Sequence, residues 1–247
     1  MTQLNPELIN LFNEHFISLP KWIGDFNEKC LVDFFHFLRN NNERGGFFSK
    51  RDSNLIFERH FYESLIFVYY VTKALNVSRE TKVADAGSGP GLPGYFFHCL
   101  KETPYVTLID SSKRRLGILE KECVNKDLNN LEFIFERIEN IRNRFDLVTA
   151  RALIPFPFII EVFSSSIRTG GHAVLFAADN KSLHKTEKEY LDKLGFVSRE
   201  TLVPDEINVE FTRTIKILEK VKKSSQGYPR PWRKIKEEIS VWQKSSV

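Results

Sequence analysis

The sequence predicts an α/β protein built on a mostly parallel sheet, and three observations agree on this. Short apolar segments alternate with segments of helical length and spacing between residues 81 and 194. A glycine-rich turn follows the first strand-like segment, and two strand-like segments without a helix between them follow residue 195. Such alternation favours a parallel sheet with helices on both faces, here closed by an antiparallel hairpin.

Residues 1–76 are predicted to form a helical extension packed on the sheet domain. Apolar side chains at helical spacing predict helices at Pro6–Ser18, Gly24–Arg39 and Phe57–Leu75. The segment Asn40–Asn54 contains three successive asparagines and a Gly-Gly pair, which predict a loop.

Residues 77–220 are predicted to form the sheet domain itself. Five strands are expected at Thr81–Ala86, Tyr105–Asp110, Leu131–Phe135, Phe145–Ala150 and Gly171–Ala178. The helices between them are expected at Leu92–Lys101, Ser112–Lys126, Phe158–Arg168 and Ser182–Leu194. The closing hairpin is expected at Phe196–Val203 and Phe211–Glu219.

Residues 221–247 are predicted to form a basic C-terminal tail. The tail carries seven basic and two acidic residues, a net charge of +5 against −1 for the first 220 residues. It also contains Tyr228, Trp232 and Trp242, so it offers cations for phosphates and rings for stacking. A merely solvated terminus is the alternative.

Composition places the chain among globular proteins and limits the classes it can belong to. Apolar residues make up 42% and charged residues 28% of its 247 residues. The longest apolar run, Leu65–Val71, is too short to cross a bilayer, and the N-terminus lacks the pattern of a secretion signal. Cys30, Cys99 and Cys123 are odd in number and far apart, so we expect reduced thiols, a cytoplasmic protein and no metal site.

The run Val83–Gly94, at the end of the first predicted strand, carries the strongest functional signal. A dinucleotide fingerprint would need glycine at the position of Leu92, which disfavours a nicotinamide-dependent dehydrogenase. The order of Asp85 followed by Gly87, Gly89 and Gly91 instead resembles the cofactor loop of S-adenosylmethionine-dependent methyltransferases. There a carboxylate suits the ammonium end of the cofactor, and glycines let backbone N–H groups approach it. A glycine-rich hairpin is the alternative.

Three further positions follow predicted strands and are candidates for the same site. Asp110 ends the second strand, where an acidic residue accepts hydrogen bonds from ribose hydroxyls, although it could also cap the next helix. Ile138 and Glu139 follow the third strand, beside the expected adenine position, although Glu139 could be an ordinary residue of a helical first turn. Arg151 ends the fourth strand and is directed into the site, with a surface arginine as the alternative.

Together, these motifs resemble one family, the small-subunit (16S) ribosomal RNA guanine-N7 methyltransferases, also called glucose-inhibited division protein B or methyltransferase G. The resemblance covers residues 57–230. The matching stretches, in family order, are Glu58–Leu65, Asp85–Gly94, Leu108–Ser111, Phe145–Ala152 and Tyr228–Arg230.

The resemblance implies a Rossmann-like methyltransferase fold with a seven-stranded sheet. It further implies S-adenosyl-L-methionine as cofactor, held by Gly87, Leu92, Ile138, Glu139 and Arg151. The substrate is expected to be a guanine of small-subunit ribosomal RNA, free or in an assembling subunit, with basic contacts at Arg114, Arg115, Arg137, Arg213 and Arg230. We expect a monomer that needs neither metal nor membrane, with a basic tail that becomes ordered when RNA is present.

The expected reaction is in-line methyl transfer to guanine N7 without a general base, in which Arg151 is the catalytic candidate. Two alternatives stay open. One is a methyltransferase with a different substrate. The other is a non-catalytic ribosome-assembly factor, because Ala177-Ala178 stands where the family commonly has a Lys-Gly pair.

Overall fold

The strands of the computed structural model form one seven-stranded sheet in the order β3-β2-β1-β4-β5-β7-β6. The structure describes residues 4–124, 126, 128–151, 154–177, 185–204 and 214–245. The pairs β1–β2, β2–β3 and β4–β5 are parallel, whereas β7 runs antiparallel to both β5 and β6. The mostly parallel sheet with a closing hairpin is therefore confirmed. The residues divide into two compact units, Met1–Phe135 and Glu136–Val247.

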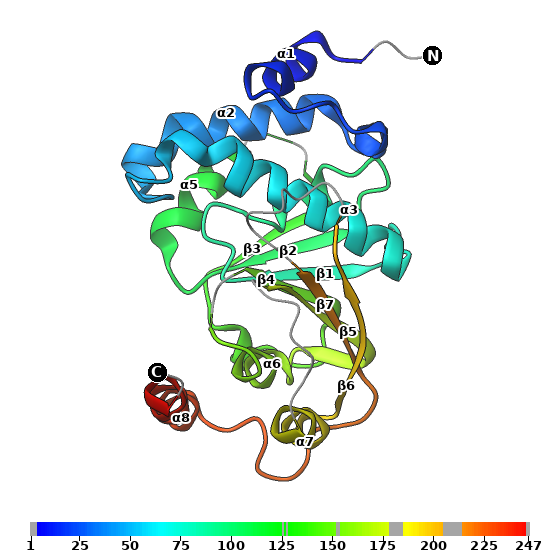
Figure 1. Cartoon of the computed structure of the whole chain (residues 1–247), viewed down its shortest axis with the longest axis vertical. Helices are drawn as coiled ribbons and strands as arrows, with labels where there is room; N and C mark the ends of the chain where they lie inside the picture. The colour runs from blue at the N-terminus through cyan, green and yellow to red at the C-terminus, as the bar shows by residue number, and fades with distance from the viewer. Residues whose placement is uncertain are drawn as a thin grey trace. The chain divides into compact units, whose positions relative to one another are not determined.

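The first unit combines N-terminal helices with three parallel strands (Figure 1). The strands are β1 (Lys82–Ala86), β2 (Tyr105–Ile109) and β3 (Leu131–Ile134). The long helices are α1 (Pro6–Glu14), α2 (Glu28–Gly45), α3 (Glu63–Leu75) and α5 (Lys113–Cys123). Short helical turns cover Lys21–Asp25 and Ser53–Leu55, and a π-helix covers Ile56–Tyr62.

Helix α2 shows both how the apolar pattern works and where its end was misplaced. The predicted apolar stripe is buried, with Leu31, Phe34 and Leu38 no more than 2% exposed. The helix continues past Arg39 to Gly45, so the predicted loop at Asn40–Asn54 begins too early. Gly46 then ends the helix with a φ of +57°, a left-handed conformation that glycine adopts without steric cost.

Helix α4 (Tyr95–His98) is much shorter than the predicted helix Leu92–Lys101. Its N-terminal neighbours belong to a compact loop instead. The amide groups of Gly91 and Leu92 both donate to the carbonyl oxygen of Ser88, at 2.8 and 3.0 Å. The predicted helix is too long because the apolar side chains at its start belong to a buried loop and not to a helix face.

The expectation of reduced thiols is wrong for two of the three cysteines. Cys30 near the start of α2 and Cys99 just after α4 form a disulfide, although 69 positions separate them in the sequence. The loop Asp25–Asn27 brings them together, since the amide of Asn27 donates to the carbonyl of Cys99 at 2.7 Å. Cys123 is free and buried. The sequence spacing gave no signal for a pair that only the packing of α2 on α4 creates.

The described residues of the second unit form four strands and three helices (Figure 1). The strands are β4 (Phe145–Arg151), β5 (Ile167–Ala177), β6 (Phe196–Leu202) and β7 (Thr214–Lys220). The helices are α6 (Phe158–Phe163), α7 (Lys185–Leu194) and α8 (Trp232–Ser245), with a 3-10 turn, η4, at Ile138–Asn140.

Helix α6 ends at Phe163, earlier than the predicted Arg168, and β5 begins at Ile167. Two serines explain the early end. The hydroxyls of Ser164 and Ser166 donate to the carbonyls of Glu161 and Phe163, at 2.8 and 2.9 Å. Such local side-chain bonds compete with the helix for its carbonyl groups.

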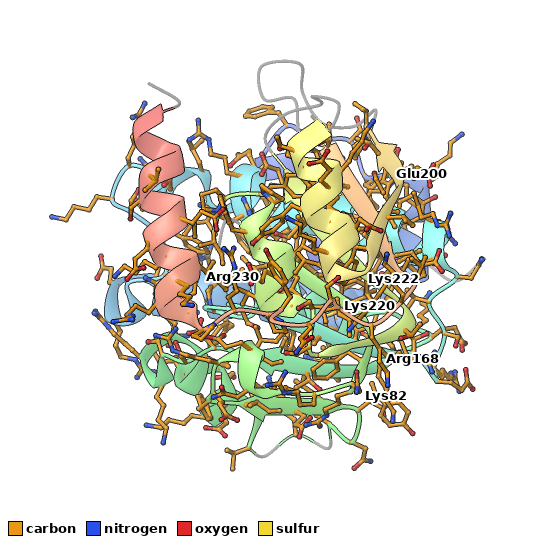
Figure 2. All side chains as sticks on the ribbon, turned by 90° about the horizontal axis from the view of Figure 1, so that it is seen from below. Lys82, Arg168, Glu200, Lys220, Lys222 and Arg230 are labelled. Carbon is orange, nitrogen blue, oxygen red and sulfur yellow. A yellow bond between two sulfur atoms is a disulfide. The ribbon has the colours of Figure 1, made fainter. Side chains whose placement is uncertain are left out.

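Lys220 at the end of β7 is a cation inside the second unit (Figure 2). It is 4% exposed, and its ammonium donates to the carbonyl oxygens of Ser164 and Ile167. Burial lowers the pKa of this lysine. Lys220 therefore joins the end of β7 to the turn between α6 and β5.

The tail, predicted to become ordered with RNA, forms helix α8 in the isolated chain. Ile235 and Ile239 lie on its inner face and are 2% and 8% exposed. The helix thus has an apolar face that packs on the chain itself, and its dependence on RNA stays a prediction. Within the part of the chain that the structure describes, no helix combines the length and apolarity that a bilayer crossing requires.

Candidate functional site

The loop between β1 and α4 takes the backbone conformation that its glycines allow. Gly87, Gly89 and Gly91 have φ values of +72°, +54° and +106°. Each lies in the region that is costly for residues with a Cβ atom. The loop therefore keeps its shape only with glycine at these alternating positions. The amides of Gly87 and Gly91 donate to the carbonyls of Ile109 and Ser88, both at 2.8 Å.

Asp85, at the end of β1, holds this loop through a hydrogen bond. It is fully buried, and its Oδ2 accepts a hydrogen bond of 3.0 Å from the amide of Gly94. A Cβ atom at Gly94 would lie 2.5 Å from the Cβ of Asp85 and 2.4 Å from Leu108. The carboxylate thus fixes the far end of the loop. Its expected contact with the ammonium group of a ligand stays a prediction.

Asp110 joins the loop to the next helix. Its Oδ2 accepts from the amide of Gly89 at 2.9 Å, and its Oδ1 accepts from the amide of Ser112 at 2.8 Å. The second contact is the local turn at the start of α5 that the sequence also predicted. Each carboxylate oxygen can accept a further hydrogen bond, so both roles remain compatible.

The first turn of α5 carries Lys113, Arg114 and Arg115, all of them exposed. The partial positive charge of a helix N-terminus disfavours cations there. Among the residues that the structure describes, no carboxylate forms an ion pair with any of the three. A Cβ at Gly89 would lie 3.9 Å from the Cδ of Arg115, so this arginine borders the glycine loop. The cluster is suited to an anionic partner.

The motif at Glu58–Leu65 begins within the π-helix Ile56–Tyr62. The ring of His60 stacks on Phe48 with centroids 4.1 Å apart, and Arg59 pairs with Asp52 at 3.3 Å. π-helices are rare and are frequent at functional sites. The structure thus joins this motif to Phe48.

In the second unit, the residues expected beside an adenine form the turn at η4. Ile138 is buried, and the side chain of Glu139 is 22% exposed. The hydroxyl of Ser165 donates to the carbonyls of Glu139 and Ile141, at 3.2 and 3.3 Å. Arg137 lies 3.4 Å from the Oε1 of Glu139. Ser165 therefore holds the turn through the carbonyl of its middle residue and that of the residue that follows it.

Arg151 is the last residue of β4 and is partly buried. Its guanidinium carbon lies 5.9 Å from the centre of the Phe176 ring, on the paired strand β5. Arg151 ends a parallel strand as predicted, and its direction into the site stays a prediction. The ring restrains the guanidinium from one side.

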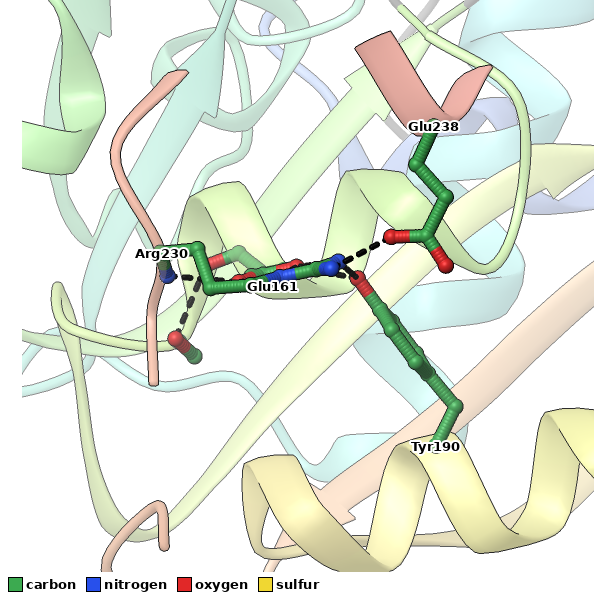
Figure 3. A network of polar contacts seen from close by, with 5 residues as sticks. Glu161, Tyr190, Arg230 and Glu238 are labelled. Atoms are coloured by element: carbon green, nitrogen blue, oxygen red, sulfur yellow. Dashed lines mark hydrogen bonds and ion pairs between the residues drawn. The ribbon is translucent and has the colours of Figure 1, made fainter. Parts of the chain in front are cut away.

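Arg230 lies in an intramolecular network rather than on an open surface (Figure 3). Its Nε and Nη2 donate to the buried carboxylate of Glu161, at 3.0 and 2.8 Å. Its Nη2 also donates to the hydroxyl of Tyr190 at 2.8 Å, and its Nη1 pairs with Glu238. Glu161 raises the pKa of Arg230, and burial raises the pKa of Tyr190. Because these partners occupy the guanidinium, we do not include Arg230 among the proposed RNA contacts.

Several predicted positions lie outside the described residues, namely Arg213, Ala178, Ala152 and the starts of the predicted segments Ser182–Leu194 and Phe211–Glu219. Within the described ranges, no three histidine, cysteine, aspartate or glutamate side chains are grouped so that they could hold a metal ion.

Four residues shape these regions in ways that the sequence did not predict: Ser88, Glu161, Ser165 and Trp232, of which only Trp232 was named, as a ring for stacking. Ser88 is buried, and its hydroxyl donates to the carbonyl of Asp85 and accepts from the amide of Ile109. Its place between two glycines could have indicated this role. The other three act through contacts distant in sequence, for which the local pattern gives no signal.

Comparison of the sequence with known proteins matches this chain to one family. The sequence model described as "GidB: rRNA small subunit methyltransferase G" matches residues 27–201. A protein of Leptospira biflexa with the name ribosomal RNA small subunit methyltransferase G is 43% identical over 218 residues, which are 87% of this chain and 88% of that protein. A protein of the same name from Leptospira interrogans is 39% identical over 236 residues, 94% and 91% of the two chains.

A solved structure shows the same fold at low sequence identity. A mutant of MtNAS in complex with S-adenosylmethionine aligns with a TM-score of 0.53 and 15% identity. The alignment covers 79% of this chain and 77% of the other. This likeness confirms the methyltransferase fold that the sequence predicted.

Proposed function

This chain belongs to the rRNA small subunit methyltransferase G family, and from this membership we propose how it methylates one guanine of 16S rRNA. It is an S-adenosylmethionine-dependent rRNA (guanine-N7)-methyltransferase. We propose in-line transfer without a general base, on free 16S rRNA or an assembling subunit, by a monomer in the cytoplasm.

The glycine loop carries the proposal for cofactor binding. Its three left-handed glycines set the path of the loop, and Asp110 holds Gly89 while keeping acceptor capacity for ribose hydroxyls. The residues present therefore fit an adenosyl cofactor. We assign Asp85, Gly87, Gly89, Gly91, Leu92 and Asp110 of the first unit, and Ile138, Glu139 and Arg151 of the second, to its binding.

The chemistry needs no proton acceptor from the protein. S-adenosylmethionine supplies a methyl group on a sulfonium sulfur, which the unprotonated lone pair of guanine N7 can accept directly. The protein then contributes positioning and exclusion of water. Arg151 is suited to hold an anionic or carbonyl group, such as the cofactor carboxylate, guanine O6 or a phosphate. The product base is cationic, so a role for Arg151 as an acid is disfavoured.

The exposed cations at the start of α5 support RNA binding. Arg114 and Arg115 have the charge and the freedom from internal carboxylates that phosphate contacts require. We propose Arg137 and Arg213 as further contacts. Since the N7 edge lies in a deep, narrow groove of A-form RNA, the target guanine must be unpaired or extruded from its stack.

Replacement of Arg151 tests this assignment. We expect Arg151→Ala to lower kcat for methyl transfer to small-subunit rRNA by about 100-fold, because a positioning contact is lost. Arg151→Lys should recover part of the rate, because it keeps the charge but not the bidentate geometry. Circular dichroism and thermal melting control for folding. Normal turnover by folded Arg151→Ala would remove Arg151 from the site.

A further inference from the structure

The C-terminal segment is bound to the second unit by a set of side chains that we call the C-terminal latch: Glu161, Tyr190, Arg230 and Glu238 (Figure 3). Glu161 is fully buried on α6 and accepts from the backbone amide of Arg230 at 2.6 Å as well as from its guanidinium. The hydroxyl of Tyr190 on α7 donates to the same carboxylate. The latch therefore fixes both the backbone and the side chain of the residue that leads into α8.

The latch also fixes the direction in which α8 leaves. Arg230 pairs with Glu238 within α8, and Ile235 and Ile239 bury the inner face of this helix. Trp232 is the first residue of α8, two positions after Arg230. The backbone at Trp232 is thus anchored on both sides.

Trp232 lies against the turn that we assign to the cofactor. The guanidinium carbon of Arg137 is 5.7 Å from the centre of the Trp232 ring, within the range of a cation–π contact. The Nη1 of Arg137 also lies 3.4 Å from the Oε1 of Glu139. A chain of contacts therefore runs from the latch through Trp232 and Arg137 to Glu139, entirely within the second unit.

We propose that Trp232 is a positioning residue that acts through Arg137 to hold the turn Arg137–Glu139 in its cofactor-binding conformation. The inference rests on the proposed function, because that function assigns Ile138 and Glu139 to the cofactor. It adds a role for a helix that begins beyond the residues matched by the family, which end at residue 201. The C-terminal helix is then part of the cofactor site's support as well as a basic surface.

The physical reason is restraint of a long side chain. The side chain of Arg137 is 53% exposed, so without the ring it would sample many rotamers and leave Glu139 without a fixed neighbour. A cation–π contact at an exposed site corresponds to a few-fold change in an equilibrium constant. We therefore expect a moderate effect on cofactor affinity and little effect on the chemical step.

The test measures binding of S-adenosylhomocysteine to the full-length chain by calorimetry. Trp232→Ala should weaken binding about three- to fivefold, whereas Trp232→Phe, which keeps an aromatic face, should stay within about twofold of the wild type. Arg137→Ala should have a similar effect, and the double variant should bind no more weakly than either single variant. In turnover assays, Trp232→Ala should raise KM for S-adenosylmethionine and leave kcat unchanged.

Arg233→Ala is the matched control on the same helix. The side chain of Arg233 is 85% exposed and pairs with Glu237 at 3.8 Å, so its loss should leave cofactor affinity unchanged. Equal affinity of wild type and Trp232→Ala, or additive effects in the double variant, would overturn the inference while leaving the proposed function intact. Absence of binding by the wild type would overturn both.

A spectroscopic readout separates positioning from general stability. The chain has three tryptophans, so the double variant Trp22→Phe and Trp242→Phe leaves Trp232 as the only one. Its fluorescence should change on titration with S-adenosylhomocysteine, with the affinity that calorimetry gives. An unchanged signal at saturation would contradict a contact between Trp232 and the cofactor turn.

Discussion

The glycine loop and the C-terminal latch fix their parts of the molecule by opposite means. The loop at residues 85–94 uses the backbone, since left-handed glycines and short-range amide contacts set its path. The latch uses side chains from three helices, and the bond between Arg230 and Glu161 spans 69 positions. One region is encoded by neighbouring residues, and the other exists only after the chain has folded.

This difference predicts different responses to substitution. A loop built from backbone geometry tolerates no added Cβ atom, so a single methyl group should disrupt it. A latch built from several hydrogen bonds should lose strength stepwise, because its remaining members still contact one another.

Gly94→Ala should have the largest effect. The new Cβ would lie 2.4 Å from the Cδ2 of Leu108 and 2.5 Å from the Cβ of Asp85, far closer than van der Waals contact. Neither residue can move freely inside the sheet. We expect a loss of about 4 kcal/mol in the free energy of unfolding, together with loss of cofactor binding. Urea unfolding measures the first and calorimetry the second. Gly24→Ala, where an added Cβ meets nothing within 4 Å, is the control. Equal stability of the two variants would refute a close-packed loop.

Cys30→Ser should have the next largest effect. It compares the disulfide with the glycine loop, which both lie in the first unit. The disulfide closes a long loop between α2 and α4, so its loss should cost about 3 kcal/mol of unfolding free energy in the absence of reductant. Affinity for S-adenosylhomocysteine should change little, because the glycine loop is fixed by its own backbone. A reductant should bring the wild type to the level of this variant, and Cys123→Ala should keep the sensitivity to reductant. A wild type insensitive to reductant would contradict the disulfide.

Glu161→Gln should have the smallest effect of the three. The amide keeps one acceptor oxygen for Arg230 and Tyr190 but loses the charge, and we expect a loss of about 2 kcal/mol. Hydrogen exchange should rise in residues 228–240, whereas the glycine loop should be unaffected. Glu237→Gln, which removes an exposed partner of Arg233, should change stability by less than about 0.5 kcal/mol. Unchanged exchange in α8 would show that the latch does not hold it.

The same contrast explains how much could be predicted from the sequence. The mostly parallel sheet with its closing hairpin was predicted from periodicity, the seven-stranded sheet from the family resemblance, and the loop from glycines whose conformational role is local. The ends of α2 and α6, the disulfide and the contacts of Arg230 depend on tertiary packing. Arg230 shows the limit most directly: it was expected to contact RNA, but its partner Glu161 lies 69 positions away in α6 and has no recognisable pattern around it.

Methylation of guanine N7 is best measured as transfer of labelled methyl groups from S-adenosylmethionine to small-subunit rRNA from cells that lack this protein. Deproteinised rRNA and immature subunits would be assayed in parallel, with Gly94→Ala as the inactive control. We expect label in a single N7-methylguanosine with the wild type and none with the variant. No label on either substrate, from a wild-type protein that binds the cofactor, would contradict this expectation.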